Sequence, residues 1–576
     1  MRKNVAQILV SFLEKEGVRH VFGIPGGYNL SFLRELQAQG GVSFVRTQHE
    51  GGAAFMADGY ARASKKFGCL LTTAGPGATN SITGLISSNA DSSPVLSIIG
   101  SIPPSRFFMG AIQDTYSYGI DIDSIFNEIS RFHAAISSAD TFLHYARTAV
   151  NYLFKGRKGP VVLNIASDVF QKEIEYASDF DYGYISSGAY FDMEAADMAV
   201  ETIASSKSLL ILAGYGVQLA SAEAELLRLA ELLNAPVIVT PKGKSSMDNE
   251  SPLFLGVYGL GANVIPELFI RSEKIDTLLI VGSSLNEYAS NVWSDDLVAM
   301  PKVVHVDIDP YAIGGILPGS IGVVGDAKAA MRYLCERIER LSHEKIVSLD
   351  ARQKIGDFRH SHDNLENSAA FESSAIPIKP QRLMKDIHDS FPEENVIVFI
   401  DAGQVIWWAG HYLKLRKGWR YHASLGFSSM GFGIPASIGG KFADPTSTVI
   451  AIAGDGGAIM NGNELKTAAE YGVPVFVFVI NDGRYNIIHH STMAMYGEPA
   501  PGADYREPVD FVRFAEGLGV RAFRVDEPGW INARRMEELK ALKAPVLFDC
   551  RTDPEEKANI SGRIKSVDSG ATRDSS

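Results

Sequence analysis

A short pattern recurs along the chain: the dipeptide Pro-Val, followed by a run of β-branched and other apolar residues. The pattern begins at five prolines, Pro94, Pro160, Pro236, Pro474 and Pro545. Proline is tolerated as the first residue of a strand, and continuous apolar runs suit strands that helices cover on both faces. Similar runs occupy residues 209–214, 277–282, 302–309, 396–403 and 449–456. Because helical patterns alternate with these runs, the sequence predicts an α/β fold of doubly wound parallel sheets.

Two segments interrupt this alternation. Residues 176–190 are polar and aromatic without a helical period, and residues 359–380 mix charge, Ser and Pro. Such composition is typical of linkers. The chain has 576 residues, which exceeds what one hydrophobic core supports. We therefore expect three doubly wound domains and a flexible tail, in the order 1–175, 190–350, 375–555 and 556–576.

Composition excludes several classes of protein. The net charge is -13 and no cluster of Lys and Arg occurs, so nucleic acid is not an expected partner. The chain has no run of about 18 apolar residues, and charged residues 14–16 interrupt the apolar stretch near the N-terminus. We therefore expect neither a membrane span nor an export signal. Cys69, Cys335 and Cys550 are too scattered for a disulfide framework or a zinc site, which makes the cytoplasm the expected location.

The strongest chemical signal is a pair of polar residues in the third domain. One apolar run ends in the sequence GDGG, which contains Asp455, and the next ends in NDG, which begins at Asn481. A strand-helix-strand crossover returns the chain to the same edge of a sheet. Both side chains are therefore expected at the carboxyl ends of neighbouring strands, where open α/β sheets bind ligands.

The residue types at this edge predict a phosphate and metal site. A carboxylate, an amide oxygen and a loop carbonyl, assigned to Gly483, suit Mg²⁺ or Ca²⁺ better than zinc. Backbone N–H groups can approach an anion closely at three glycines, Gly454, Gly456 and Gly457. Asn461 and Glu464 are predicted to cap the helix that follows. GDG alone is more often an ordinary turn, but the second strand ending in NDG favours the metal site.

In combination, these features resemble the metal-diphosphate motif of thiamine diphosphate-dependent enzymes. Residues 46–63 are similar to the segment that carries the catalytic glutamate of that family. Four more stretches, 20–33, 73–85, 401–409 and 428–440, resemble acetolactate synthase and its close relatives in order and position. The resemblance implies a pyrimidine-binding first domain, a central α/β domain and a third domain that binds thiamine diphosphate and the metal.

The resemblance assigns the catalytic acid to Glu50. This residue would hydrogen bond N1′ of the aminopyrimidine and favour the tautomer whose N4′ removes the C2 proton of the cofactor. Without the metal motif, Glu50 would be interpreted as an acid stabilised at a helix N-terminus. Pro25 is expected beside the cofactor, and Gly27 belongs to the catalytic set.

Four further positions match the family's cofactor contacts. Met430 matches the apolar residue that bends the cofactor, and the carbonyl of Ser428 would accept from its 4′-amino group. Gly403 and Gln404 match the positions that hold the far side of the diphosphate. Val405 replaces a His that is common there in the family, so that contact is left open.

The resemblance also implies the reaction. A 2-oxo acid, with pyruvate as the expected donor, would lose carbon dioxide, and the acyl carbanion equivalent would pass to a carbonyl or unsaturated carbonyl acceptor. Gln113 matches a glutamine that acetolactate synthases place near the substrate, whereas simple decarboxylases carry two His in the first domain. His489 and His490 follow Asn481 closely, which makes them candidate catalytic residues or ordinary structural histidines.

Two other functions remain open from the sequence. One is a 2-oxo acid decarboxylase that releases an aldehyde, and the other is a noncatalytic nucleotide-binding protein on the same scaffold. In the family, the glutamate domain of one subunit meets the metal domain of another. We therefore expect a homodimer at minimum and favour a homotetramer.

FAD is not expected. Acetolactate synthases hold FAD in the middle domain with a Gly-Ala-Arg-Phe-Asp-Asp stretch and a Met-His pair. Here residues 282–287 are GSSLNE and residues 256–261 are GVYGLG, without the Arg and the His. Gly214 and Gly216 also lack the third glycine of a dinucleotide fingerprint.

Overall fold

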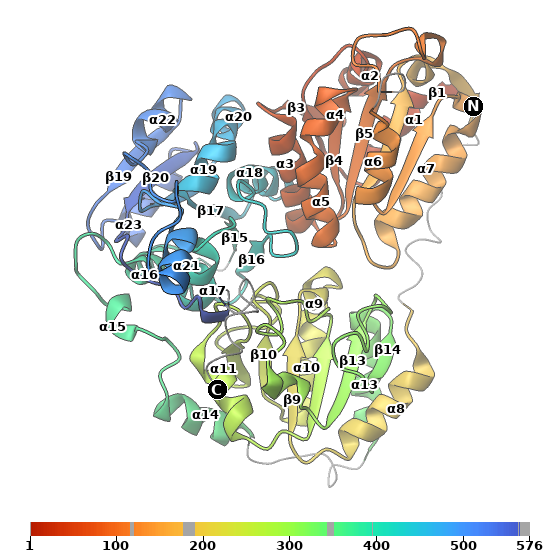
Figure 1. The fold of residues 1–576 in the computed structure, drawn as a ribbon. Helices are drawn as coiled ribbons and strands as arrows, with labels where there is room; N and C mark the ends of the chain where they lie inside the picture. The colour runs from red at the N-terminus through yellow and green to blue at the C-terminus, as the bar shows by residue number, and fades with distance from the viewer. Residues whose placement is uncertain are drawn as a thin grey trace.

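The computed structural model describes residues 2–115, 120–176, 190–341, 351–393, 395–562 and 564. This part of the chain forms three α/β domains, each built on a six-stranded parallel sheet with helices on both faces (Figure 1). The predicted fold class is confirmed. In Figure 1 the N-terminal and C-terminal domains lie side by side, with the middle domain below them.

The N-terminal domain has the strand order β3-β2-β4-β5-β7-β6. Its strands are β2 (His20–Gly23), β3 (Ser43–Arg46), β4 (Gly68–Thr73), β5 (Val95–Ser101), β6 (Phe132–Ile136) and β7 (Val161–Ala166). Its helices are α1 (Val5–Lys15), α2 (Leu30–Gln39), α3 (Glu50–Ser64), α4 (Pro76–Asn80), α5 (Ile82–Ala90), α6 (Ile122–Ile129) and α7 (Ala139–Phe154). Two short strands, β1 (Arg2–Asn4) and β8 (Glu173–Glu175), pair antiparallel beside the main sheet.

The middle domain has the strand order β11-β10-β9-β12-β13-β14. Its strands are β9 (Leu209–Ala213), β10 (Val237–Val239), β11 (Phe254–Val257), β12 (Thr277–Val281), β13 (Lys302–Asp307) and β14 (Ile321–Val324). Its helices are α8 (Met193–Ala204), α9 (Gly216–Leu219), α10 (Glu223–Leu233), α11 (Val264–Ser272), α12 (Asp295–Val298), α13 (Ala327–Arg340) and α14 (Ala351–Ser361).

The C-terminal domain has the strand order β16-β15-β17-β18-β20-β19. Its strands are β15 (Val396–Ile400), β16 (Arg420–Ala423), β17 (Thr448–Gly454), β18 (Val475–Asn481), β19 (Arg521–Val525) and β20 (Val546–Arg551). Its helices are α15 (Ser368–Phe371), α16 (Pro380–Ser390), α17 (Val405–Tyr412), α18 (Gly433–Ala443), α19 (Asp455–Asn461), α20 (Leu465–Glu470), α21 (Asn486–Tyr496), α22 (Phe511–Gly517) and α23 (Ala533–Lys540), with a 3-10 turn, η4 (Gly462–Glu464), between α19 and α20.

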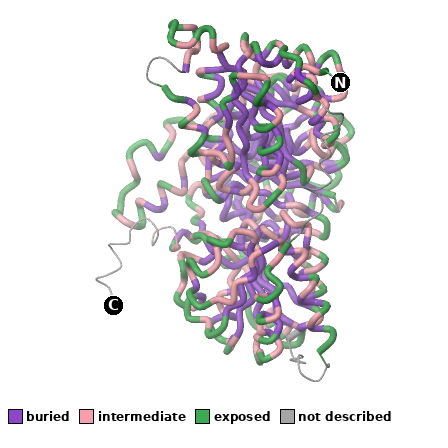
Figure 2. The backbone as a smooth tube through the Cα atoms, turned by 90° about the vertical axis from the view of Figure 1, so that its right-hand side faces the viewer, coloured by how far each residue is buried: buried purple, intermediate pink, exposed green. Residues whose placement is uncertain are grey.

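The Pro-Val pattern locates five strands to the residue. Strands β5, β7, β10, β18 and β20 each begin at the Val that follows the proline. The other five apolar runs contain β9, β12, β13, β15 and all of β17 except its first residue, Thr448. Most residues of these strands are buried, as Figure 2 shows for the interior of the molecule, because helices cover both faces of each sheet.

The N-terminal and C-terminal domains share one hydrophobic core, whereas the middle domain has its own. The two outer domains meet where α3 packs on α18 (Figure 1). A Cβ added to Gly59 would lie 2.0 Å from the carbonyl oxygen of Ala436, and one added to Gly439 would lie 1.9 Å from that of Met56. The helices can approach this closely only because both positions are glycine.

The predicted linkers and tail are only partly described. Residues 177–189, within the first predicted linker, lie outside the described residues, and α14 and α15 occupy part of the region around the second. Ala558 and Ile560 are buried against the C-terminal domain, so the start of the predicted tail is packed. Residues 563 and 565–576 lie outside the described residues. None of the helices in the described part of the chain is long and apolar enough to cross a membrane.

Candidate functional site

A cavity of about 590 Å³ lies at the carboxyl ends of β15, β17 and β18. Eight of the predicted cofactor-binding residues line it: Gly403, Gln404, Ser428, Met430, Gly454, Asp455, Gly456 and Gly457. The middle domain contributes residues 286–288 and Trp293 to the wall. We call this cavity, with Asn481 and Gly483 beside it, the C-terminal half-site.

The polar ends of β17 and β18 meet as the sequence predicts. The Asp455 carboxylate accepts from the backbone N–H of Gly456 at 2.7 Å and from that of Gly483 at 2.9 Å. The side-chain amide of Asn481 donates to Asp549 at 2.7 Å and to the carbonyl of Val509 at 2.9 Å. These two bonds use the amide nitrogen and leave the buried Oδ1 of Asn481 without a partner.

This donor set fits a hard divalent cation. Burial and the nearby charge of Asp482 both raise the pKa of Asp455. A bound cation would relieve both effects, and the unpartnered Oδ1 of Asn481 supplies a second oxygen ligand. Among the described residues, no three His, Cys, Asp or Glu side chains cluster as a metal site, which is consistent with a site that also uses amide and carbonyl oxygens.

The glycine backbone of the same cavity fits an anion. Gly403 has a φ of 113°, and an added Cβ at Gly403 or at Gly454 would meet no atom within 4 Å. Gln404 precedes α17, is 7% exposed and has no partner at either polar atom of its side-chain amide. Open space beside glycine backbone, an unpartnered amide and a helix N-terminus together suit a phosphate group.

Ser428 and Met430 form another wall of the same cavity. Ser428 adopts a left-handed φ of 54°, which marks a tight turn after β16. A Cβ at Gly456 would lie 2.9 Å from the methyl carbon of Met430, so glycine at 456 makes room for this side chain. The fold therefore gathers into one cavity a group of predicted residues that come from three loops.

Glu50 lies in the N-terminal domain as the first residue of α3. It is 8% exposed, and its carboxylate accepts from the side-chain amide of Asn80 at 3.0 Å. A Cβ added to Gly77 would lie 3.3 Å from Oε1 of Glu50. His49 caps α3 by accepting from the N–H of Gly51. The structure thus places Glu50 at the start of α3, among the loops at the carboxyl ends of the strands.

The other predicted residues of this domain lie at the same edge of its sheet. Pro25 and Gly27 are exposed in the loop after β2, which Asn29 holds by accepting from the N–H of Gly26 at 2.9 Å. Gln113 is half-buried in the loop after β5, and its Cβ would be 3.0 Å from a Cβ at Gly75. We call these residues and Glu50 the N-terminal half-site.

The two half-sites do not form one cavity within a chain. Among the described residues, the cavity that contains Asp455 is lined only by the middle and C-terminal domains. Beside the packing of α3 on α18, Glu464 joins the two domains, since it accepts from the N–H groups of Gln48 at 3.1 Å and His49 at 2.9 Å. The predicted cap by Asn461 and Glu464 is wrong, because α19 begins at Asp455 and these residues lie at its far end.

His489 and His490 lie on α21, whose first turn lines the cavity, but neither residue is in the lining. His489 Nδ1 lies 2.9 Å from the carboxylate of Asp504. His490 is 3% exposed, both of its ring nitrogens lack partners, and burial lowers its pKa to about 4. A neutral buried imidazole fits a structural residue beside the cavity at least as well as a catalytic one.

Several lining residues were not singled out from the sequence. Asp482 follows Asn481 directly, and burial raises its pKa although Asn486 donates to its carboxylate at 2.9 Å. Trp407, Trp408 and Tyr288 give the cavity an aromatic wall. Adjacency to Asn481 could have indicated Asp482, but Tyr288 belongs to another domain and no local pattern marks it.

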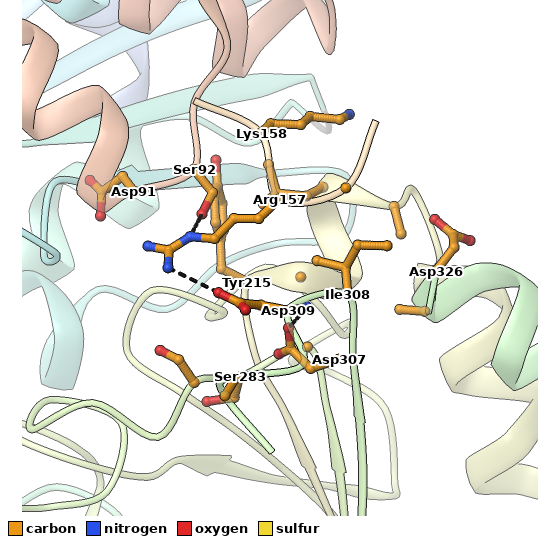
Figure 3. Close-up of a pocket in the computed structure, with 18 of the residues that line it drawn as sticks. Asp91, Ser92, Arg157, Lys158, Tyr215, Ser283, Asp307, Ile308, Asp309 and Asp326 are labelled. Atoms are coloured by element: carbon orange, nitrogen blue, oxygen red, sulfur yellow. Dashed lines mark hydrogen bonds and ion pairs between the residues drawn. The ribbon is translucent and has the colours of Figure 1, made fainter. Parts of the chain in front are cut away.

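A second cavity, of about 630 Å³, lies where the carboxyl ends of the middle-domain strands face the N-terminal domain (Figure 3). Arg157 donates to Asp309 at 3.1 Å and to Ser92 at 3.3 Å. Burial raises the pKa of Asp307 to about 6. Ser283, from the GSSLNE stretch, lines this cavity, and Asn286, from the same stretch, lines both cavities.

Comparison with known proteins matches all three domains to one family. Residues 3–118 match the N-terminal TPP binding domain of thiamine pyrophosphate enzymes, residues 196–334 match the central domain, and residues 401–550 match the C-terminal TPP binding domain. These matches cover every residue of both half-sites.

Several similar proteins, matched over nearly their whole length, are named for one activity. The chain is 33% identical to "Probable acetolactate synthase large subunit" of Methanococcus aeolicus, over 96% of this chain and 92% of the relative. It is 30% identical to "Acetolactate synthase" of Arthrospira platensis, over 95% and 94%. It is 28% identical to "Acetolactate synthase isozyme 3 large subunit" of Escherichia coli (strain K12), over 93% and 92%. The chain therefore belongs to the thiamine pyrophosphate enzyme family, in its acetolactate synthase-like group.

Proposed function

We propose that the protein is a thiamine diphosphate-dependent carboligase. It decarboxylates a 2-oxo acid, with pyruvate as the favoured donor, and transfers the acyl carbanion equivalent to a carbonyl or unsaturated carbonyl acceptor. The observation that carries the proposal is the unpartnered Oδ1 of Asn481 beside the Asp455 carboxylate, in a cavity with an open glycine cradle. The acetolactate synthase names of the relatives support the reaction class.

In the proposed site, the bound cofactor supplies a stabilised carbanion at its thiazolium C2. The chain binds and orients it. Asp455, Asn481 and the carbonyl of Gly483 would hold Mg²⁺, or Ca²⁺ in its place, and that ion would neutralise the diphosphate. Gly403 and Gln404 would bind the far phosphate oxygens, and Ser428 and Met430 would orient the aminopyrimidine.

Glu50 holds the proton that the aminopyrimidine shares. Its partly enclosed carboxyl group, near Gly77 and bonded to Asn80, keeps bulk water from competing for that proton. Gln113 and Gly27 lie at the same sheet edge as Glu50, which supports a place near the substrate. Because the Gln113 side chain is neutral, it can orient a carbonyl acceptor without protonating the carbanion.

We propose a homodimer as the minimal active unit, with a homotetramer as the favoured assembly. The separation of the two half-sites within one chain supports this, since the acid must reach the cofactor from a second copy. Apolar side chains are exposed near both half-sites, which suits burial against a partner: Phe108, Met109 and Ile112 in the N-terminal domain and Phe427 and Ile488 in the C-terminal domain. The cytoplasm is the proposed location, and the three free, buried cysteines support it.

We also propose that the middle-domain cavity holds no FAD. The guanidinium of Arg157 is already paired with Asp309, and residues 282–287 and 256–261 lack the Arg and the His with which the family holds FAD. The purified protein should be colourless. Stoichiometric flavin absorbance at about 450 nm would contradict this.

The test of the reaction uses labelled pyruvate, thiamine diphosphate, Mg²⁺ and a panel of aldehyde and 2-oxo acid acceptors, with products identified by mass spectrometry. A carboligase gives acetolactate or acyloin products. Free acetaldehyde as the sole product would show a decarboxylase. Absence of thiamine diphosphate binding in calorimetry would remove the proposed function altogether.

A further inference from the structure

The loop that follows β10, residues 240–249, extends from the middle domain to the other two domains. We call it the β10 loop. We propose that the β10 loop is a positioning element for the cofactor cavity, with Lys244 fixing α17 and Lys242 fixing the segment that carries Ser428 and Met430. The inference rests on the proposed function, because it concerns the same cavity, and it gives the middle domain a role in that site.

Lys244 lies at the end of α17 that points away from the cavity. It is 3% exposed, and its ammonium donates to the carbonyl oxygens of Ala409 at 2.8 Å and Gly410 at 2.6 Å. It also lies 5.7 Å from the centre of the Tyr421 ring. Among the described residues, no carboxylate forms an ion pair with it. The charge of this buried lysine is therefore balanced mainly by the carbonyl end of α17.

The other end of α17 borders the cavity at Gln404. A cation at the carbonyl end fixes the position of the helix, and the helix in turn fixes the N–H groups that face the diphosphate. This contact is enclosed, and burial lowers the pKa of Lys244 to about 7. Lys244 touches neither cofactor nor substrate in this arrangement, so it is a positioning residue.

Lys242 acts on the opposite wall of the cavity. Its ammonium donates to the Asp91 carboxylate at 2.7 Å, and the same Asp91 oxygen accepts from the N–H of Gly426 at 2.8 Å. A Cβ at Gly426 would lie 2.7 Å from the carbonyl oxygen of Ala90, so this approach requires glycine. The other Asp91 oxygen accepts from Arg62 at 2.8 Å, so Lys242 and Arg62 together fix this carboxylate. Gly426 lies two residues before Ser428, and its bond to Asp91 therefore holds the turn that presents Ser428 and Met430.

Hydrogen bonds hold the β10 loop in a defined conformation. Thr240 Oγ1 accepts from the N–H of Gly243 at 3.1 Å, and Ser246 donates to the carbonyl of Gly214 at 3.0 Å. The side chain of Asn249 donates to the carbonyl of Lys244 at 3.2 Å. Ser245 also accepts from the N–H of Tyr421 at 3.1 Å. The two lysines are thus fixed relative to each other before they contact the cavity walls.

The first test is the variant Lys244→Met, which keeps the length of the side chain and removes its donors. We expect the dissociation constant for thiamine diphosphate, measured by calorimetry with saturating Mg²⁺, to rise about tenfold or more. At saturating cofactor, kcat should stay within about twofold, because the chemistry does not use this residue. Lys244→Arg, which keeps donors for both carbonyls, should restore most of the affinity.

Lys441 provides a matched control in the same domain. Its ammonium donates to the carbonyls of Pro445 at 3.0 Å and Ser447 at 2.5 Å, in the loop after α18. Lys441→Met loses a similar pair of bonds but leaves α17 untouched, so cofactor affinity should not change. An equal loss of affinity in both variants, or no loss in Lys244→Met, would overturn the Lys244 part of the inference.

The second test is Lys242→Met. Here we expect a large change in kcat and only a small change in cofactor affinity, the reverse of the result expected for Lys244→Met. The kcat and the rate of C2 hydrogen-deuterium exchange on the bound cofactor should fall about tenfold or more, with a smaller change in cofactor affinity. An unchanged exchange rate would overturn the Lys242 part.

Circular dichroism and thermal unfolding check that each variant folds. If Lys244→Met does not fold, Lys244→Gln replaces it, since its shorter side chain reaches at most one carbonyl, and unchanged affinity in that variant counts against the inference. Failure of the wild-type protein to bind thiamine diphosphate would instead refute the proposed function.

Discussion

At the scale of single residues, the C-terminal half-site contains carboxyl groups that no ion pair with a described residue neutralises and a polar atom that has no hydrogen-bond partner. Asp455 is buried and Asp482 is partly buried, and burial raises the pKa of each carboxyl group. The Oδ1 of Asn481 is buried without a partner. A fold retains such groups at a cost to stability when a ligand completes them. This imbalance is physical support for a cation site at these residues.

The first prediction concerns Glu50. Glu50→Gln should reduce kcat by about 10²- to 10⁴-fold, because the amide cannot exchange a proton with the aminopyrimidine. Cofactor affinity should change little, since the proposed metal and diphosphate contacts lie in the C-terminal half-site. The C2 exchange rate on the bound cofactor, followed by NMR, measures the effect. Asn80→Ala, which removes only the hydrogen bond to Glu50, should have a much smaller effect.

The second prediction concerns pH. The proposed Mg²⁺ site requires the ionised form of Asp455, and burial together with Asp482 raises the pKa of that carboxyl group. Affinity for Mg²⁺ and cofactor should therefore fall as the pH is lowered through the Asp455 pKa. Asp482→Asn removes one of the two causes, so the fall should move to lower pH. Calorimetric titrations at a series of pH values test this, and a shift to higher pH would contradict it. Asp455→Asn should abolish metal-dependent binding at every pH.

At the scale of secondary-structure elements, close helix packing sets the relation between the outer domains. Helices α3 and α18 cross with glycine on each side, Gly59 against the carbonyl of Ala436 and Gly439 against that of Met56. The contact joins two domains into one hydrophobic core. Because Glu50 begins α3, the same packing fixes the start of the N-terminal half-site.

The third prediction follows from this crossing. Gly59→Ala should lower the free energy of unfolding by about 1–3 kcal/mol or more, since its Cβ would meet backbone that cannot move aside. Gly356→Ala is the matched control, because Gly356 is also within a helix but an added Cβ would meet nothing within 4 Å. There the same change should be neutral or stabilise by about 0.5–1 kcal/mol. Urea unfolding distinguishes the two outcomes.

The fourth prediction concerns Glu464, which joins η4 to the residues before α3. Burial raises its pKa from 4.5 to about 7, so between these values the folded state binds more protons than the unfolded state. Stability should therefore fall as the pH rises across this range, by up to about 3 kcal/mol from this group. Glu464→Gln should flatten that part of the pH profile, as measured by urea unfolding from pH 5 to pH 8. A steeper profile in the variant would show that the sign is wrong.

At the scale of the whole molecule, the chain carries two half-sites that do not form a common cavity. Glu50, Gln113 and Gly27 lie at the sheet edge of one domain, and the metal-type ligands lie at the sheet edge of another. The shared core fixes the relative position of these domains, so hinge closure within one chain would have to break it. Association of two copies is the simpler way to complete the site.

The fifth prediction tests this assembly by complementation. Glu50→Gln and Asp455→Asn are each expected to be inactive alone. When the two variants are unfolded together and refolded as a mixture, about a quarter of the sites should regain both intact halves if each site spans two chains. Activity of the mixture, compared with each variant refolded alone, measures this. No gain of activity would show that both halves of a site belong to one chain.

The sequence could predict what depends on local pattern. The Pro-Val pattern located five strands, because proline at a strand start and buried β-branched runs are local signals. The spacing of Asp455 and Asn481 predicted that both lie at the same edge of the sheet. A strand-helix-strand connection between parallel strands returns the chain to that edge. The resemblance to a known family added Glu50, Ser428 and Met430, whose positions at the half-sites no short pattern would have revealed.

Other features depend on contacts between segments distant in sequence. The cap predicted for Asn461 and Glu464 is wrong because Glu464 binds backbone N–H groups some 415 positions earlier in the chain. The aromatic wall at Tyr288 and the support from Lys244 come from the middle domain, and neither has a local signature.

By itself, the sequence determined the class of the fold, the strand ends that carry polar residues and the kind of ligand those residues suit, because periodicity and residue chemistry are properties of neighbours along the chain. Only the tertiary structure decided which loops share a cavity, which buried polar atoms lack partners and which domains are joined in one core. Those properties arise from packing between remote segments, where a shift of one ångström changes a contact and leaves the sequence pattern unchanged.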